Sequence, residues 1–126
     1  MMNRHKSRGG AGRILRACAF SVRGLCGAWR HEAAFRQELL LCLIALPLAW
    51  WLARSVPELL ALLGVLVLVL VVELLNSALE AVADAVTLED HPLIGRAKDM
   101  ASAAVMLALV LAAIVWLAVA WQRLVN

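Results

Sequence analysis

The sequence predicts an all-α membrane protein: an N-terminal amphipathic surface helix followed by three transmembrane helices. Three observations predict this fold class: 64% of the 126 residues are hydrophobic, only 17% are charged, and the mean hydropathy is +0.87. A water-soluble domain of this size could not bury that much apolar surface. The length accommodates a single domain with about three membrane-spanning helices of roughly 20 residues each. A large transporter built from internal repeats is therefore excluded.

The composition also excludes other classes of protein. Disordered chains are poor in hydrophobic residues, collagen has a glycine at every third position, and nucleic-acid-binding domains carry a larger basic excess than the net charge of +3. Cys18, Cys26 and Cys42 lack the CxxC spacing of metal or redox motifs and are interpreted as small hydrophobic residues. No apolar run follows the basic start closely enough for a cleaved signal peptide, so we expect a retained N-terminus that is flexible over residues 1–12.

An amphipathic helix is expected over residues 13–30. Its apolar residues recur at helical spacing and are Ile14, Leu15, Cys18, Val22, Leu25, Cys26 and Trp29. The arginines that fall on the other face are Arg13, Arg16, Arg23 and Arg30. This division suits a helix that lies in the headgroup layer of an anionic membrane. The alternative is an ordinary packing helix with a solvated arginine face.

Three hydrophobic segments follow, and we expect them to span the membrane over about residues 35–53, 59–83 and 100–121. Tryptophans lie near the end of the first and third segments, as is typical of membrane interfaces. A short link, residues 54–58, joins the first two segments. A polar loop is expected over residues 87–99, between the second and the third.

The distribution of basic residues predicts the orientation, because Lys and Arg near span ends stay in the cytoplasm. Eight of the twelve precede Leu39, namely Arg4, Lys6, Arg8, Arg13, Arg16, Arg23, Arg30 and Arg36. The N-terminus is therefore expected in the cytoplasm, together with the loop over residues 87–99. The surface helix and this loop would then meet at the same face of the membrane.

The second hydrophobic segment carries Glu73, Asn76 and Glu80 at positions i, i+3 and i+7, which places all three on one helix face. An ionisable residue within a membrane span costs a few kcal/mol or more, so it is a functional candidate by default. The alternative is that these groups join helices together or emerge into the headgroups.

Two carboxylates at different depths can divide the labour of a reaction. Glu73, the deeper one, suits a general base, whereas Glu80 suits a ligand of a divalent metal. A single carboxylate binds Mg²⁺ weakly, and Glu32 or Glu38 lies at a similar depth to join it.

Near the start of the third span, Lys98 and Asp99 add a cation for phosphate and a further polar group. The set as a whole predicts a phosphoryl-transfer site at the bilayer interface. The phosphate-binding loop and the other sequence motifs of soluble kinases are absent from the chain. His91, judged by its position alone, is expected to be a solvated loop residue.

Three blocks of sequence carry a resemblance to a known family: EAAFRQE at residues 32–38, VELLNSALEAVAD at residues 72–84 and GRAKDMAS at residues 95–102. In order and spacing they resemble the bacterial integral-membrane diacylglycerol kinases, and the likeness extends over residues 13–121. The resemblance implies ATP-dependent phosphorylation of diacylglycerol to phosphatidic acid, with Mg²⁺ as the metal. It also implies a homotrimer in the bacterial inner (cytoplasmic) membrane, with a composite site shared between neighbouring subunits.

The resemblance also assigns roles to residues. It implies that Glu73 is the general base for the lipid hydroxyl, that Asn76 belongs to the catalytic centre, and that Glu32 and Glu80 bind the metal. The positions that it places at the nucleotide are Arg13, Phe20, Glu32, Glu80, Glu89, Asp90, His91, Lys98 and Asp99. Those that it places on the lipid side are Arg13, Ser21, Trp29, Ala34, Phe35, Arg36, Gln37, Glu38, Glu73, Ser102 and Trp116.

Two departures from the family pattern bear on the nucleotide. Phe20 stands where the family commonly has Tyr, which removes any hydrogen bond from that hydroxyl. Pro92 stiffens the loop, so residues 86–94 match less well than the helices do.

Two other functions remain open at this point. Related three-span proteins phosphorylate undecaprenol, which shares the headgroup chemistry and differs only in the lipid. A membrane subunit without enzymatic activity, whose buried acids serve assembly or an ion pathway, is the second alternative. None of these candidate functions is expected to involve nucleic acid as a partner.

Overall fold

The computed structural model describes residues 9–126, and within them the chain folds into four helices, as the fold class predicted. The helices are α1 (Gly10–His31), α2 (Ala33–Leu52), α3 (Val56–Val86) and α4 (Pro92–Val125). A flexible N-terminus was expected over residues 1–12. Residues 1–8 lie outside the described part of the chain. The expectation is wrong for Gly10–Gly12, which belong to α1.

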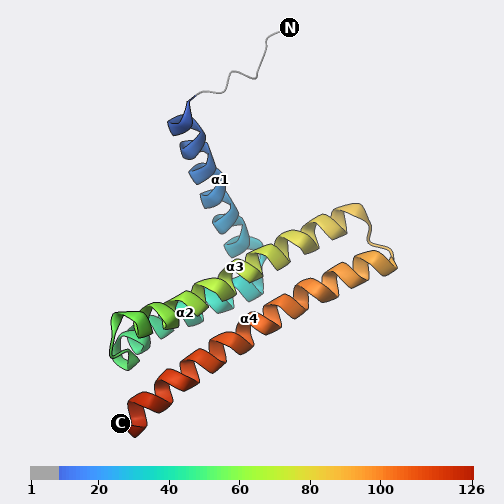
Figure 1. Cartoon of the computed structure of the whole chain (residues 1–126). Coiled ribbons are helices and arrows are strands. Elements are labelled where there is room, and N and C mark those ends of the chain that lie inside the picture. The colour runs from blue at the N-terminus through green and yellow to red at the C-terminus, as the bar shows by residue number, and fades with distance from the viewer. Residues whose placement is uncertain (1–8) are drawn as a thin grey trace.

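Three of the helices, α2, α3 and α4, are long and apolar enough to cross a membrane. They lie side by side, whereas α1 leaves the bundle at a steep angle (Figure 1). The apolar side chains along α1, such as Ile14, Leu15 and Phe20, are exposed. This leaves α1 free to lie along a membrane surface, which is the behaviour that its amphipathic pattern favours.

The chain turns between α1 and α2 at a single residue. Glu32 adopts an extended backbone, and its N–H donates to the Ala28 carbonyl. The guanidinium of Arg36 donates to the carbonyl oxygens of Trp29 and Arg30 at 2.8 and 3.2 Å. Arg36 thereby binds the carbonyls that α1 leaves without partners at its C-terminal end.

The link between α2 and α3 is shorter than the expected residues 54–58, because α3 already begins at Val56. Ser55 caps that helix: its Oγ accepts a hydrogen bond from the Glu58 N–H at 3.3 Å. The carboxylate of Glu58 in turn accepts from the backbone N–H of Arg54 at 2.8 Å. This reciprocal pattern, with Pro in the first turn, is a strong start signal for a helix.

The polar loop expected over residues 87–99 is wrong in its second part. Only Thr87–His91 separates α3 from α4, because His91 caps α4 by accepting a hydrogen bond from the Leu93 N–H at 3.2 Å. Pro92 is the first residue of the helix, where its fixed φ and missing N–H cost nothing. Lys98 and Asp99 therefore project from a rigid helix.

The bundle is packed most tightly in the half that contains the α2–α3 link. Its core consists of Ala49, Leu52, Leu62 and Val119, and Val69, Ala108 and Ala112 extend it along α3 and α4. Small residues let the helix backbones approach closely. The indole N–H of Trp116 donates to the backbone carbonyl of Leu62 at 3.2 Å, so that α4 is tied directly to α3.

Candidate active site

The polar residues of α3 lie in its second half. A helix rises 1.5 Å per residue, so Glu73 lies about 21 Å along the axis from Leu59, where the apolar run begins, and Glu80 about 32 Å. The hydrocarbon core of a bilayer is about 30 Å thick. Glu73 therefore falls inside the apolar layer, close to one face, and Glu80 falls at its boundary.

Glu73 is buried although it is a carboxylate in an apolar helix. Its side chain is only 5% exposed, and the hydroxyl of Ser77, itself 8% exposed, donates to Glu73 Oε1 at 3.5 Å. A carboxyl group in such a place is costly unless it has a partner or a function. The bond from Ser77 is long and engages only one of the two carboxylate oxygens.

A second pair follows one turn along the helix. Asn76 Nδ2 donates to Glu80 Oε1 at 3.4 Å, whereas Asn76 Oδ1 is buried and has no hydrogen-bond partner within residues 9–126. The charges of Glu80 and Glu32 both act on Glu73. Asn76 and Glu80 thus pair along α3 beside Glu73, whereas Glu32 lies outside this helix, at the junction of α1 and α2.

A further acid, Glu38, lies on α2. Its charge repels that of Glu73, and its Oε2 is buried without a partner in the described part of the chain. The buried oxygens of Glu38 and Asn76 can accept hydrogen bonds from a polar ligand.

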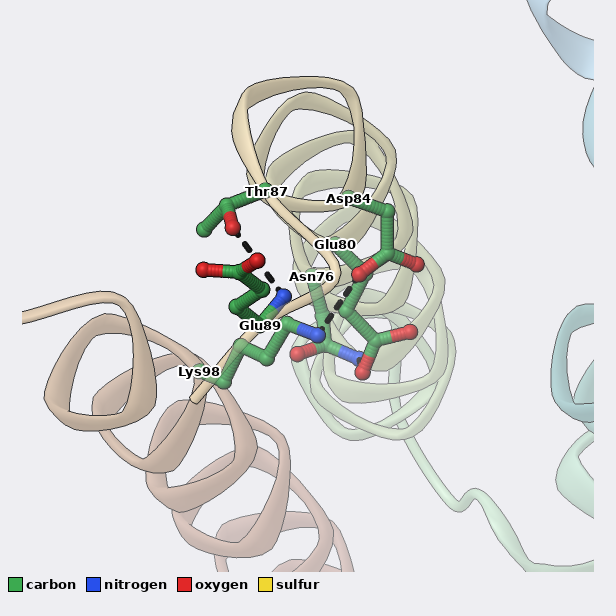
Figure 2. A network of polar contacts seen from close by, with 6 residues as sticks. All are labelled: Asn76, Glu80, Asp84, Thr87, Glu89 and Lys98. Atoms are coloured by element: carbon green, nitrogen blue, oxygen red, sulfur yellow. Dashed lines mark hydrogen bonds and ion pairs between the residues drawn. The ribbon is translucent and has the colours of Figure 1, made fainter. Parts of the chain in front are cut away.

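The short α3–α4 loop forms a cavity of about 570 Å³ that Asp84, at the end of α3, also lines. Four of the residues expected at the nucleotide line it, namely Glu89, Asp90, His91 and Lys98. Lys98 Nζ lies 2.7 Å from Asp84 Oδ1 and is also attracted by Glu80 (Figure 2). Thr87 Oγ1 accepts from the Glu89 N–H at 3.0 Å and fixes the start of the loop.

The residues expected on the lipid side divide between three hollows. Ser21 and Glu32 line a cavity of about 710 Å³ between α1 and α3, which Ser77 also lines. Trp29 and Phe35 line an apolar crevice of about 600 Å³ where α1 and α2 meet α3.

The third hollow is an apolar crevice of about 350 Å³ between α2, α3 and α4, which Glu38 and Trp116 line. All three hollows border α3; Glu32 lines the first and Glu38 lines the third. A long apolar ligand could therefore lie against the helices with its polar end at the carboxylates.

Other predicted site residues do not reach this group within one chain. Arg13 and Phe20 are exposed on α1, whose N-terminal end points away from the bundle (Figure 1). The remaining exposed residues of the predicted set are Ala34, Gln37, Asp99 and Ser102. Arg36 is occupied with the carbonyls at the end of α1.

Ser77 and Asp84 were not predicted as site residues, but they contact residues that were. Ser77 donates to Glu73, and the signal for it was its position four residues further along the same helix face. Asp84 pairs with Lys98 across the loop, a contact that only the antiparallel packing of α3 and α4 creates. No local spacing could have revealed this second contact.

The donor set suits a magnesium ion that is bound together with a nucleotide. Within residues 9–126 no group of three or more acidic, histidine or cysteine side chains is arranged to hold a metal alone. Mg²⁺ in kinases is commonly held by one or two carboxylates together with substrate phosphates. Glu32 and Glu80, which are both partly exposed and whose charges act on Glu73, fit that role.

The fold and the site together define an integral membrane protein whose helical bundle carries a carboxylate cluster, with a lysine beside it, near one face of the bilayer. The model of the family "Prokaryotic diacylglycerol kinase" matches residues 19–120, and the chain belongs to that family.

Named relatives agree with this family. The chain is 46% identical to the diacylglycerol kinase of Escherichia coli strain K12 over 111 residues, which cover 88% of this chain and 91% of the relative. It is 47% identical to the diacylglycerol kinase of Pseudomonas aeruginosa strain PAO1 over 111 residues, with 88% and 90% covered. It is also 41% identical to that of Haemophilus influenzae over 103 residues, with 82% and 87% covered.

Proposed function

We propose that this protein is an ATP-dependent diacylglycerol kinase, which transfers the γ-phosphoryl group of ATP to the free hydroxyl of diacylglycerol and forms phosphatidic acid. The observation that carries the proposal is the carboxylate of Glu73, which is buried in an apolar membrane-spanning helix and hydrogen-bonded to Ser77. Membership of the family supports the choice of reaction.

Glu73 is the general base in this proposal. Its carboxylate accepts the proton of the lipid hydroxyl while that oxygen forms a bond to the γ-phosphorus of ATP. The bond from this phosphorus to the oxygen that bridges it to the β-phosphate breaks, and ADP leaves with the electron pair. The Ser77 hydrogen bond holds one oxygen of Glu73 and supports a fixed orientation of the other.

The nucleotide binds at the polar end of the bundle. Lys98 neutralises phosphate charge, and the α3–α4 loop residues Glu89, Asp90 and His91 surround the rest of the nucleotide. Mg²⁺, held by Glu32 and Glu80, supplies charge neutralisation for the transferring phosphoryl group when it is bound. Asn76 orients Glu80 through its amide.

The lipid approaches from the apolar side. The crevice with Trp29 and Phe35 and the crevice with Glu38 and Trp116 offer apolar walls for acyl chains that reach toward Glu73. The remaining lipid-side candidates, Ala34, Gln37 and Ser102, are exposed, as a surface that contacts lipid or a neighbouring subunit must be.

The working unit in this proposal is a homotrimer with composite sites. The large exposed apolar side chains along α2, α3 and α4 favour subunit contacts, and the distance of Arg13 and Phe20 from the loop cavity favours their use in a neighbour's site. The carboxylate end and the N-terminus face the cytoplasm of the bacterial inner membrane, in keeping with the distribution of Lys and Arg.

The first test is transfer of labelled γ-phosphate from Mg-ATP by the purified protein in mixed micelles that contain dioleoylglycerol and undecaprenol side by side. Labelled phosphatidic acid is expected. Preferential labelling of undecaprenol would move the function to a polyprenol kinase. No labelled lipid from a folded oligomer would leave the acids of α3 with a role in assembly or ion passage.

Composite sites are tested by mixing two inactive variants. Glu73→Gln and Arg13→Gln are each purified, combined in denaturing detergent and returned to mixed micelles, so that mixed oligomers form. If the two residues act in one site from different subunits, the mixture recovers activity that neither variant has alone. If the activity of the mixture does not rise above that of the two variants alone, each subunit needs both of its own residues.

A further inference from the structure

The end of the bundle opposite the carboxylates carries two arginines that the proposed reaction does not use. Arg54 lies in the link between α2 and α3, and Arg123 lies in the last turn of α4. The Arg54 guanidinium donates to the backbone carbonyl of Arg123 at 3.2 Å. Figure 1 shows the C-terminal end of α4 at the same end of the bundle as the α2–α3 link.

Neither of these guanidinium groups is paired with a carboxylate. The salt bridge between Lys98 and Asp84 is the only one within residues 9–126. Glu58 lies beside the link, but its carboxylate accepts the backbone N–H of Arg54 at 2.8 Å and is fixed there by the helix cap. Both guanidinium charges are thus left for an external anion.

Their donors are also left available. Arg123 lies over the ring of Trp51, with its Cζ 5.4 Å from the ring centroid, and such stacking uses the face of the guanidinium while its N–H edges stay free. Arg54 donates one side-chain hydrogen bond out of the five N–H groups that an arginine carries. Planar N–H edges match the oxygens of a phosphate group and bind it in pairs.

The depth of this end fits the phosphate layer of a membrane. Three exposed tryptophans surround it, with exposed fractions of 76% for Trp50, 53% for Trp51 and 70% for Trp121. Tryptophan rings gather at the level of the lipid headgroups. Arginine side chains at that level lie within reach of headgroup phosphates, to which a guanidinium can donate paired hydrogen bonds.

We propose that Arg54 and Arg123, braced by Trp51, form a binding site for the phosphate of an anionic phospholipid in the leaflet away from the carboxylate cluster. The headgroup phosphate accepts hydrogen bonds from both guanidinium groups, and its acyl chains lie along the exposed apolar faces of α2 and α4. This site is separate from the phosphoryl-transfer site and stands without it.

The test uses the tryptophans of the protein itself, because four of the five, Trp50, Trp51, Trp116 and Trp121, lie in this half of the bundle. The full chain is reconstituted in vesicles of phosphatidylcholine and phosphatidylglycerol at fixed ratio, with bromine on the acyl chains of one lipid or of the other. Excess quenching by brominated phosphatidylglycerol over brominated phosphatidylcholine measures anionic lipid held near these rings.

The wild type is expected to show this excess, and Arg54→Gln/Arg123→Gln is expected to abolish it. Each single variant should lower the relative association constant for the anionic lipid about fivefold. The matched control is Arg16→Gln/Arg96→Gln, which removes two exposed arginines from the other end of the molecule and should keep the excess.

Three results would overturn the proposal: equal quenching by both lipids in the wild type, an excess that survives in Arg54→Gln/Arg123→Gln, or equal loss in the control. Circular dichroism and tryptophan emission in pure phosphatidylcholine check folding. If the double variant does not fold, Arg123→Lys replaces it. Lysine keeps the charge but lacks the planar pair of donors, so an unchanged excess in that variant would also count against the site.

Discussion

The two halves of α3 belong to one continuous helix and differ in almost everything else. In the first half Leu62 is completely buried against Ala49, Leu52 and Val119, and Trp116 donates a hydrogen bond to its backbone. In the second half two of the three buried residues, Glu73 and Ser77, are polar, and the third is Ala83. The first half ties the bundle together, whereas the second half keeps polar groups in an apolar layer at a cost in stability. This contrast indicates that stability and chemistry are separated along a single helix.

The largest effect is expected from Glu73→Gln. Loss of the general base should lower the rate of phosphoryl transfer by about a thousandfold, within the range that positioned bases contribute. The variant keeps the size and the hydrogen-bonding capacity of the side chain, so folding should be retained. The rate is measured with Mg-ATP and dioleoylglycerol in mixed micelles.

The matched control for Glu73→Gln is Glu58→Gln, which alters the same residue type at the other end of the same helix. Glu58 supports the N-terminal cap of α3 and lies far from the carboxylate cluster. Its transfer rate per folded molecule should stay within about twofold of wild type, because capping contributes to stability and not to turnover. A loss comparable to that of Glu73→Gln would break the contrast between the two halves.

Leu62→Ala should give the opposite result. The substitution opens a cavity at a completely buried position and should lower the free energy of unfolding by about 2–4 kcal/mol, while transfer per folded molecule is kept. Unfolding by denaturing detergent, followed by circular dichroism, measures the effect. Leu60→Ala, at a position 63% exposed, is the control and should cost much less; equal losses would show that the packing around Leu62 carries no special weight.

Lys98→Met should raise the KM for ATP about tenfold, since it removes a charged donor that is worth about 1.5 kcal/mol at a phosphate. Steady-state kinetics over a range of ATP concentrations measures it. Lys98→Arg keeps the charge and should recover most of the loss. A KM that does not change in Lys98→Met would remove this lysine from the nucleotide site.

The smallest effect is expected from Asp84→Asn, which breaks the ion pair with Lys98. Both side chains are about half exposed, so the loss of this solvent-screened pair should lower the free energy of unfolding only slightly. High salt screens such pairs, and the difference between variant and wild type should vanish in concentrated KCl. A larger loss that persists in salt would mean that Asp84 stabilises the bundle in another way.

Hydropathy alone predicted the helices, because runs of apolar residues long enough to span a bilayer have few other folds open to them. Hydropathy did not predict where α4 begins. Residues 92–99 contain Arg96, Lys98 and Asp99 and were expected to form a loop, but the cap of His91 and the Pro92 start make them helical.

The arrangement of candidate site residues that lie on one helix could be predicted from the sequence. Glu73, Asn76 and Glu80 follow from helical periodicity, and Asn76 and Glu80 pair along α3 beside Glu73. The contacts that depend on packing between helices could not be predicted: Asp84 with Lys98, and Trp116 with the Leu62 carbonyl. Arg13 and Phe20 were assigned by resemblance alone, and one chain does not bring them to the loop cavity.

The most direct test measures the transfer rate and the free energy of unfolding on the same samples of Glu73→Gln and Leu62→Ala. Glu73→Gln should lose transfer and keep the stability of wild type, whereas Leu62→Ala should lose stability and keep transfer per folded molecule. If the two variants lose both properties in the same proportion, the separation of chemistry and stability along α3 is contradicted, and Glu73 is a structural residue.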